Sequence, residues 1–313
     1  MKKWMVSRKQ AIALLGSNNS QPLKDSDWAD EKPQFTPMEI NRLRAEPDGK
    51  NNKPEVIAVH HTKGGVGKTT VAFNTGSYLA SQGWKVLLVD LDPSGGTTKL
   101  AGKNPSDPES VPNTMLDVFK KSTSIDKIIF TPFQNVPLDV VPCSPAFTGV
   151  SIYLAMSTGK DTFLKRHLKK LDYDFIIIDA APNWDVIHTN IFLVANHVIA
   201  PTVMETLSVM ALEELRSYIE DVLDVYDIEL PNFVILPNMM NHSVGEHKRV
   251  LERVKQERLP LAKDALGEIV VPQDAAVKTA NEKGLPIIVD KPSAKASCAL
   301  RRLANLLLTH GEE

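Results

Sequence analysis

The segment VIAVHHTKGGVGKTTVAFNTGSYLASQG, residues 56–83, decides the fold of this chain. It reads as a strand, a glycine-rich loop and a helix, which is the order found in phosphate-binding loops. Gly64, Gly65 and Gly67 allow the backbone to turn tightly, so that successive N–H groups point inward at phosphate oxygens. The positive end of the following helix adds to this attraction. The segment therefore predicts a binding site for the phosphates of a nucleotide.

Two lysines flank the glycines of this loop. The usual pattern is G-x-x-x-x-G-K-[ST], and Thr62 stands where its first glycine is expected. Lys68 is the lysine of the pattern and is expected at the β- and γ-phosphates, while the Thr69 hydroxyl is placed to ligate Mg²⁺. Lys63 is an additional cation. The residues expected to contact the nucleotide here are Gly64, Gly65, Val66, Gly67, Lys68, Thr69 and Thr70.

Two acidic motifs follow apolar runs elsewhere in the chain. KVLLVDLDPSGG, residues 85–96, places Asp90 and Asp92 at a strand end, and YDFIIIDAAPNW, residues 173–184, does the same with Asp179. Burying three carboxylates is costly unless a cation and a positively charged loop share their site. All three are therefore candidate functional residues, and Asp179 fits the acidic residue that holds Mg²⁺ through water.

The remaining pattern predicts a doubly wound α/β fold with a mostly parallel sheet. Several apolar runs are continuous Val/Ile/Leu stretches, as in strands buried on both faces, and helical patterns separate them. Such a fold places its ligand site at the carboxyl ends of the strands. The runs are residues 56–60, 85–90, 138–142, 175–179, 197–202, 233–238 and 268–272.

The residue composition of the chain changes near residue 54. Residues 45–55, AEPDGKNNKPE, collect Pro, Gly, Asn and charges without apolar periodicity, which is typical of a linker. We expect an N-terminal helical extension over residues 1–54 and an α/β domain that contains the phosphate-binding loop over residues 55–313.

Two short helices are expected in the N-terminal extension. Ser7 is a candidate cap for a helix through Leu15, and Thr36, Pro37 and Glu39 form a T-x-x-E capping box for a second helix. Two interpretations stay open for this segment. It is half of a helix-turn-helix DNA reader, or it is an arm that packs on a partner subunit.

Composition excludes several protein classes. The net charge of the 313 residues is -2, so any nucleic-acid surface is a local patch. The two cysteines, Cys143 and Cys298, have no C-x-x-C spacing, which argues against zinc, iron–sulfur and disulfide frameworks. No run approaches the ~20 apolar residues of a membrane-spanning helix, and the amino terminus lacks a secretory pattern. We expect a soluble cytoplasmic protein.

The three motifs KGGVGKTT, VLLVDLDPSGG and YDFIIIDAAP, in this order, resemble those of the ParA/MinD superfamily of deviant Walker-motif ATPases, and the ParA-type DNA-partition ATPases in particular. The resemblance covers roughly residues 55 to 313. Ser94 and Gly96 depart from the Gln and Asn of the family's D-x-D-P-Q-G-N stretch, and DAAPNW departs from D-x-P-P-x. Neither departure removes a charged group.

The resemblance implies an ATPase that uses ATP and Mg²⁺ and forms a homodimer around two nucleotides. Lys63 matches the signature lysine that reaches the nucleotide of the other subunit, which links ATP occupancy to dimerisation. Asp92 would orient or activate the attacking water, and Asp90 would lie nearer the Mg²⁺ shell. Lys63, Lys68 and Asp92 are thus the expected catalytic residues. Asn238 and Pro272 match segments that contact adenine.

Three outputs are known in this superfamily, namely DNA binding, membrane binding and electron transfer. Electron transfer needs cysteines at the dimer axis, which this chain lacks. The C-terminal pattern of Leu300, Leu303 and Leu307 beside Arg301 and Arg302 fits a membrane-surface helix, but it has no aromatic anchors and better fits a helix packed on the sheet. Non-specific DNA binding by the ATP-bound dimer is the expectation.

The family's DNA-binding residues cluster on C-terminal helices, where the basic side chains of this chain are interleaved with acids. A frequent arginine after a proline is matched here by Gln273, so these basic residues are candidates, and ordinary solvated helix faces are the alternative. The candidates are Lys248, Arg249, Lys278, Lys283, Lys295, Arg301 and Arg302.

The resemblance further implies a ParB-like or other centromere-binding partner that stimulates hydrolysis, and a nucleoid-associated location. The cargo is a plasmid or a chromosome. A MinD-like or nucleoid-based ATPase that positions a protein cargo is the alternative, as is an autoregulating repressor that acts through residues 1–54.

Overall fold

A computed structural model describes most of the chain, with the remaining residues in the N-terminal segment, in short internal gaps and at the C-terminus. The described residues are 4–7, 10–11, 13–14, 34–44, 53–157, 159–183, 185–229, 231–256 and 269–309.

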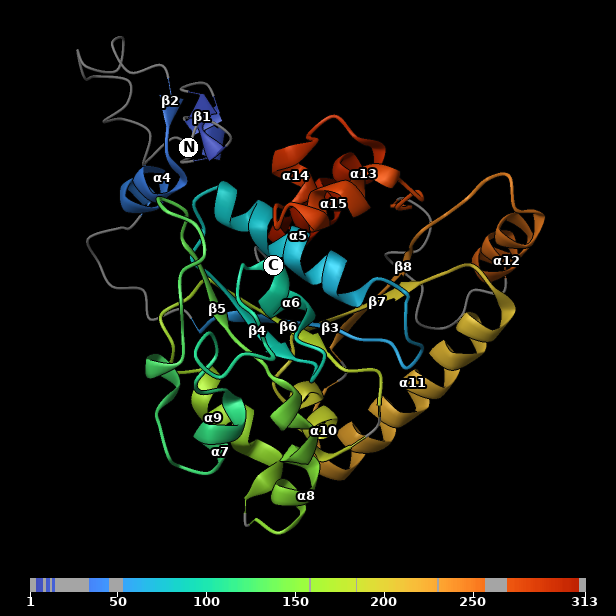
Figure 1. Ribbon diagram of the computed structural model, residues 1–313. Helices are drawn as coiled ribbons and strands as arrows, with labels where there is room; N and C mark the ends of the chain where they lie inside the picture. Colours follow the sequence, from blue (N-terminus) through green and yellow to red (C-terminus); the bar gives the residue numbers. More distant parts are fainter. Residues whose placement is uncertain are drawn as a thin grey trace.

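The centre of the molecule is a six-stranded parallel sheet in the order β5-β4-β6-β3-β7-β8, which confirms the predicted fold class. Figure 1 shows this sheet with helices on both faces. In this order β3, which leads into the glycine-rich loop, lies near the middle of the sheet. The strands of the two acidic motifs, β6 and β4, lie on one side of it, and β7 and β8 lie on the other. The strands are β3 (Glu55–Val59), β4 (Val86–Leu91), β5 (Leu138–Val141), β6 (Phe175–Ala180), β7 (His197–Thr202) and β8 (Asn232–Pro237).

Two helical layers cover the sheet, because successive strand residues point to opposite faces. Val56 and Ala58 pack toward one core with helices α7 to α11, whereas Ile57 and Val59 pack toward a second core with α5 and α13 to α15. The helices are α5 (Lys68–Ser81), α6 (Gly96–Leu100), α7 (Met115–Phe119), α8 (Val150–Ala155), α9 (Phe163–Leu168), α10 (Val186–Phe192), α11 (Thr206–Tyr226), α12 (Gly245–Gln256), α13 (Ala275–Glu282), α14 (Ile287–Asp290) and α15 (Lys295–Thr309).

The strand expected at 268–272 is wrong for the residues that the structure describes there. Pro272 makes one isolated parallel bridge to Met240, and residues 269–271 do not form a strand. A proline has no N–H to continue a ladder, so the pairing stops at a single bridge. The bridge still attaches this segment to the chain just beyond β8.

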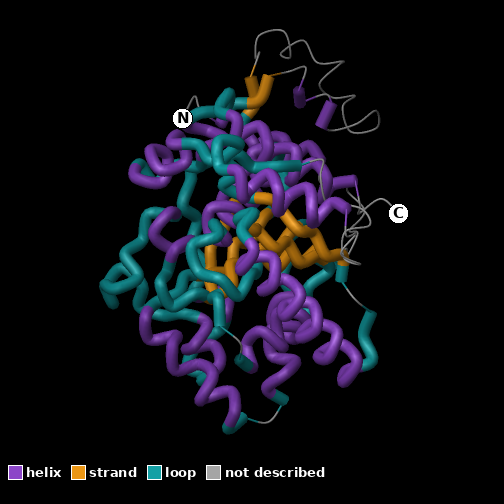
Figure 2. The backbone as a smooth tube through the Cα atoms, turned by 90° about the vertical axis from the view of Figure 1, so that its right-hand side faces the viewer, coloured by secondary structure: helices purple, strands orange, loops and turns teal. Residues whose placement is uncertain are grey.

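The described part of the N-terminal extension contains a two-stranded antiparallel sheet, β1 (Val6–Ser7) and β2 (Gln34–Phe35), followed by α4 (Pro37–Arg44). Figure 2 shows the small sheet apart from the central one. The predicted capping box is confirmed, because the Thr36 N–H donates to Glu39 Oε2 at 2.8 Å and the Glu39 N–H donates to Thr36 Oγ1 at 3.2 Å.

This extension packs on the α/β domain. The side-chain amide of Asn41 donates to the Gly83 carbonyl at 2.8 Å, and the rings of Trp4 and Phe133 lie 5.2 Å apart. Ser7 lies at the end of β1 and also caps the helix predicted after it, because the Gln10 N–H donates to Ser7 Oγ at 3.3 Å and the Ser7 N–H donates to Gln10 Oε1 at 3.1 Å. Residues 45–52 of the expected linker lie outside the described residues. A helix-turn-helix role for residues 1–54 stays a prediction.

Among the described helices, none combines the length and the apolar composition needed to cross a bilayer.

Candidate nucleotide site

The glycine-rich loop connects the carboxyl end of β3 to the first residue of α5. Gly65 and Gly67 adopt φ angles of +77° and +93°, which residues with a Cβ rarely adopt. A Cβ on Gly67 would also lie 2.4 Å from the side-chain nitrogen of Asn238. The loop therefore requires glycine at position 67 for both its backbone conformation and its close contact with the end of β8.

Lys68 is buried at the start of α5, with 7% of its surface exposed. Its Nζ donates to the carbonyl oxygen of Lys63 at 3.2 Å, so the ammonium closes the loop on itself. Burial lowers the pKa of Lys68, and the nearby carboxylates of Asp179 and Asp92 oppose that shift. This cation lies between the loop and the acidic strand ends, as a phosphate-binding lysine must.

Lys63 is held by acceptors of its own chain. Its Nζ donates to Glu205 Oε2 at 2.7 Å and to the Ser208 hydroxyl at 2.9 Å, at the start of α11. The Lys63 N–H donates to His61 Nδ1 at 2.9 Å. The hydrogen bond from Lys63 lowers the pKa of Glu205. Lys63, the loop cation that the phosphate pattern does not require, is thus bound by the carboxylate that precedes α11.

Asp90 and Asp179 are paired neighbours on adjacent strands β4 and β6, and both are buried. Burial raises the pKa of both carboxyl groups above their usual range, and the charge of Asp179 raises that of Asp90 further. The Thr97 hydroxyl donates to Asp179 Oδ2 at 2.9 Å, whereas Oδ1 has no hydrogen-bond partner among the described residues. Two adjacent buried carboxylates without a cation are an unstable arrangement, so the site is built for one.

The geometry at Asp179 fits a magnesium ion. A buried carboxylate oxygen without a partner is an open ligand, and the nearby Thr69 hydroxyl opposes the rise in the pKa of Asp179 that burial causes. No group of three or more His, Cys, Asp or Glu side chains with metal-ligand spacing occurs among the described residues. Mg²⁺ suits such a site, since it usually keeps several waters and binds one or two protein ligands together with phosphate oxygens.

Asp90 uses both of its oxygens to order the loop that follows β4. Oδ2 accepts from the Thr98 N–H at 2.8 Å and from the Thr98 hydroxyl at 2.7 Å, and Oδ1 accepts from the Asp92 N–H at 3.1 Å. Asp92 is half-exposed, and its Oδ1 accepts from the Ser94 N–H at 2.8 Å. Asp90 therefore positions Asp92, and its place in the Mg²⁺ shell stays a prediction.

A cavity of about 1010 Å³ opens beside the loop, a size that accommodates a nucleotide. The two predicted adenine contacts, Asn238 and Pro272, both line it together with Thr69 and Thr70. The Asn238 side chain also donates to the Val66 carbonyl at 2.7 Å. The fold thus brings together residues from three distant parts of the chain around one space next to the phosphate loop.

Comparison with known proteins assigns the family. A family model described as an AAA domain matches residues 54–231, more than half of the chain. The sporulation initiation inhibitor protein Soj of Bacillus subtilis (strain 168) is 30% identical over 82% of this chain and 99% of its own length. The chain belongs to the ParA-type partition ATPases. The chromosome partitioning protein ParA of Caulobacter vibrioides (strain NA1000 / CB15N) is 27% identical over 82% of this chain and 95% of its own length.

A solved structure adds information on ligands. Cobyrinic acid a,c-diamide synthase from Mycobacterium smegmatis, determined with a bound ATP analogue and magnesium, superposes with a TM-score of 0.66 at 28% identity. The match covers 83% of this ParA-type chain and 96% of that one. That structure contains an ATP analogue and magnesium. In this chain, the phosphate loop suits a nucleotide, and the open carboxylate oxygen of Asp179 suits Mg²⁺.

The candidate DNA-binding residues of this ParA-type chain fall into two groups. Lys248 and Arg249 are exposed on α12, which Figure 1 shows far from the helices of the second group. Two lysines of that second group are paired with acids, since Lys278 lies 4.0 Å from Glu282 and Lys283 lies 2.9 Å from Asp290. The second group comprises Lys278, Lys283, Lys295, Arg301 and Arg302, on or beside α13 and α15.

Sequence reasoning missed the residues that hold the functional side chains of the ParA-type site. Glu205 and Ser208 bind Lys63, and Thr97 and Thr98 bind the two buried aspartates. One signal was available for Glu205, because it follows the apolar run 197–202, and the carboxyl end of that strand borders the ligand site of such a fold.

Proposed function

We propose that this chain is a DNA-partition ATPase that pairs around ATP, binds DNA without sequence preference in that state, and releases it when a partner protein stimulates hydrolysis. The position of the buried Lys68 near the unpartnered Asp179 oxygen, with Lys63 on the same loop, supports this proposal most directly. The family membership supports it independently.

Each residue of the site has a role in this proposal. Lys68 and the loop N–H groups bind the phosphates, and Thr69 and Asp179 would hold Mg²⁺. When bound, Mg²⁺ neutralises charge that develops on the phosphate oxygens during transfer. Asp92, placed by Asp90, orients the attacking water at the edge of the loop. Asn238 and Pro272 form the wall of the base pocket.

Dimerisation is the step that Lys63 controls. The lysine lies at the surface end of the loop, 35% exposed, and in the proposed dimer it contacts the triphosphate of the other subunit. A cation delivered in trans offsets phosphate charge only when two loaded subunits meet, so nucleotide state and pairing become linked. Hydrolysis removes the γ-phosphate, and with it the negative charge that attracts Lys63 of the other subunit.

DNA is the favoured binding surface for the loaded dimer. The apolar face of α15, with Leu300, Leu303 and Leu307, is buried in the core, and so it is not free to enter a membrane. The two exposed basic groups on α12 and on α13 to α15 supply phosphate contacts, which carry no sequence information. A plasmid or chromosomal centromere complex is the cargo, a ParB-like adaptor stimulates hydrolysis, and the nucleoid is the cellular location.

Residues 1–54 form a separate extension that modulates this activity rather than performing it. Its described part packs on the α/β domain through Asn41 and Trp4, away from the phosphate loop in Figure 1. Operator binding and autoregulation by this segment remain the second candidate function.

The proposal is tested by a DNA mobility assay with ATP, with ADP and without nucleotide, in the presence of Mg²⁺. We expect binding of unrelated duplexes with ATP only, and loss of binding as salt is raised. Liposome sedimentation under the same conditions is the comparison. ATP-dependent sedimentation with liposomes in place of a DNA shift would overturn the proposal in favour of a membrane-positioning ATPase.

A further inference from the structure

Helix α8 and its C-cap residue, Met156, present two large apolar side chains to solvent. Ile152 is 72% exposed and Met156 is 84% exposed, and their spacing of four residues places them on one side of the helix. The opposite side of α8 is anchored, since Val150 and Leu154 belong to the core under the sheet. Neighbouring exposed apolar side chains on a packed helix indicate an interaction site.

A cationic pocket of about 450 Å³ adjoins this apolar strip. Met156 lines it, and so do four basic side chains from the segment after α7, from the turn before α9 and from α9 itself. No acidic side chain is among the described residues that line the pocket. Its basic residues are Lys121, Lys160, Arg166 and His167. The combination fits an acidic ligand that also carries apolar side chains.

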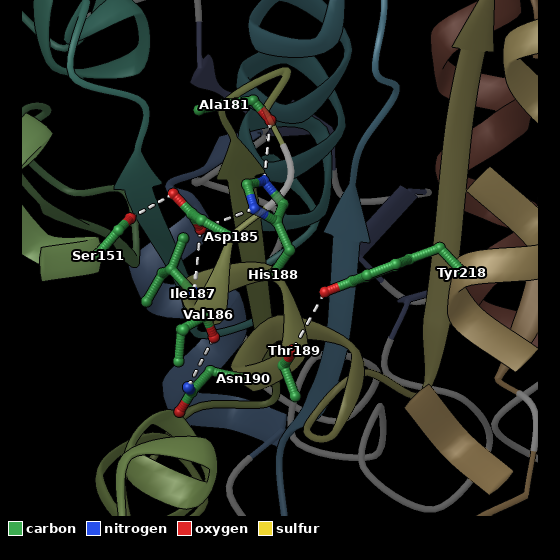
Figure 3. Close-up of polar contacts among 9 residues, drawn as sticks. All are labelled: Ser151, Ala181, Asp185, Val186, Ile187, His188, Thr189, Asn190 and Tyr218. Carbon is green, nitrogen blue, oxygen red and sulfur yellow. Dashed lines mark hydrogen bonds and ion pairs between the residues drawn. The ribbon is translucent and has the colours of Figure 1, made fainter. Parts of the chain in front are cut away.

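The anchored side of α8 is hydrogen-bonded toward the nucleotide site, as Figure 3 shows. The Ser151 hydroxyl donates to one oxygen of Asp185. The other oxygen of Asp185 lies 3.0 Å from His188 Nδ1 and accepts from the Ile187 N–H at 3.0 Å, which caps α10. His188 Nε2 lies 3.0 Å from the Ala181 carbonyl.

This chain of contacts ends two residues after the candidate magnesium ligand. Ala181 follows Asp179 by two positions on the strand end, so the ring of His188 fixes the backbone that carries the ligand. A displacement of α8 therefore changes the support of the segment after Asp179.

We propose that a short acidic and apolar segment of a partner protein docks on α8 and α9, and that the contacts Ser151–Asp185–His188–Ala181 transmit docking to the ATP site. The proposal rests on the proposed function, in which a partner stimulates hydrolysis. The apolar strip favours a protein segment over nucleic acid, because phosphate groups gain nothing from contact with Ile152 and Met156. Ser151, Asp185 and His188 are positioning residues rather than catalytic ones.

The docking surface is tested with three labelled probes on the full-length protein, measured by fluorescence anisotropy. They are a short peptide of Glu and Leu, the same peptide with Lys in place of each Glu, and a short DNA duplex. We expect the acidic peptide to bind, with about tenfold weaker binding after Lys160→Glu/Arg166→Glu and after Met156→Ser. Lys255→Glu/Lys291→Glu makes the same charge change at other exposed lysines and is expected to leave binding unchanged.

Two results would overturn the surface assignment. One is the absence of acidic-peptide binding, or binding that is insensitive to the α8 and α9 variants. The other is binding of the duplex that is lost in Lys160→Glu/Arg166→Glu, which would make this face a nucleic-acid site.

The transmission step is tested by Ser151→Ala. The variant should bind the acidic peptide like the parent, but a change of about fivefold in ATP hydrolysis on peptide binding should be lost. A rescue variant, Ser151→Thr, restores the hydroxyl and should restore the response. An unchanged response in Ser151→Ala overturns the transmission. If the parent protein does not hydrolyse ATP at all, the proposed function fails, while the anisotropy results still decide the docking surface.

Discussion

Lys63 and Glu205 form an ion pair within one chain, with 2.7 Å between Nζ and Oε2. The lysine that would contact the nucleotide of the neighbouring subunit is therefore bound within its own chain, by the Glu205 carboxylate and by the Ser208 hydroxyl. The side chains of Lys63 and Glu205 are 35% and 42% exposed, so the pair is partly screened by solvent. Glu205 carries one negative charge, whereas a triphosphate carries several. The triphosphate should therefore displace Glu205 from Lys63, so the ion pair is reversible.

Glu205→Gln is expected to favour ATP-dependent pairing, because it removes the charge that holds Lys63. An ion pair of this exposure contributes about two- to fivefold per protomer, and two protomers give about 4- to 25-fold in the dimer constant. Sedimentation velocity at several protein concentrations with ATP and Mg²⁺ measures the effect. Glu213→Gln, on the exposed side of the same helix, is the matched control. Weaker pairing in Glu205→Gln would mean that the carboxylate supports the interface instead.

Lys63→Ala and Lys68→Ala are expected to fail in different ways. Loss of Lys63 should lower hydrolysis by about 10³-fold or more, as for other cations supplied in trans, with little change in the nucleotide affinity of a single subunit. Loss of Lys68 removes charge-assisted phosphate contacts and should weaken nucleotide binding by about 10- to 150-fold. Titration with a fluorescent ATP analogue and a phosphate-release assay separate the two. Equal losses of affinity in both variants would contradict the assignment.

Asp92→Ala is expected to trap an ATP-loaded dimer. The side chain should act on water rather than on the nucleotide, so hydrolysis should drop by about 10²- to 10⁴-fold while pairing persists. Size-exclusion chromatography after incubation with ATP measures the trapped species, and Glu109→Ala, an exposed acid farther along the same connection, serves as control. Turnover at the parent rate would show that Asp92 neither orients nor activates the attacking water.

His61 should make the protein less stable toward acid. Burial, and then the charge of Lys68, lower the pKa of His61 to about 4, against about 6.5 in an unfolded chain. The unfolded state therefore binds more protons between these values, and stability falls as the pH falls through about 6.5 toward 4.

The contribution of His61 is measured by urea unfolding at pH 7.5 and at pH 5.5. In His61→Asn, which keeps an acceptor for the Lys63 N–H, the stability lost between the two pH values should be smaller by about 1 kcal/mol. An identical loss in both proteins would place the acid sensitivity elsewhere.

The parts of the molecule that sequence could predict are those encoded by short patterns. The glycine-rich loop, the six apolar strands and the Thr36–Glu39 capping box each depend on residues close together in the chain. The run 268–272 had the composition of a strand, but Pro272 limits its pairing to one bridge. Periodicity alone does not register the missing N–H of a single proline.

The supporting contacts of the site could not be predicted, because they join residues distant in sequence. Lys63 and Glu205 are separated by 142 positions, and Thr97 and Asp179 by 82. Such pairs exist only once the order of strands and the paths of the connections are fixed. Sequence patterns thus locate the charged groups, whereas tertiary structure decides which neighbour holds each of them.

The cavity beside the phosphate loop has one wall from Thr69 to Val71 and the other from Val271 to Lys278, about two hundred residues later in the chain. During synthesis on the ribosome, the loop emerges long before the opposite wall exists. A nascent chain therefore lacks a complete nucleotide pocket until residues 271–278 have left the ribosome, so it cannot enclose a nucleotide before that point.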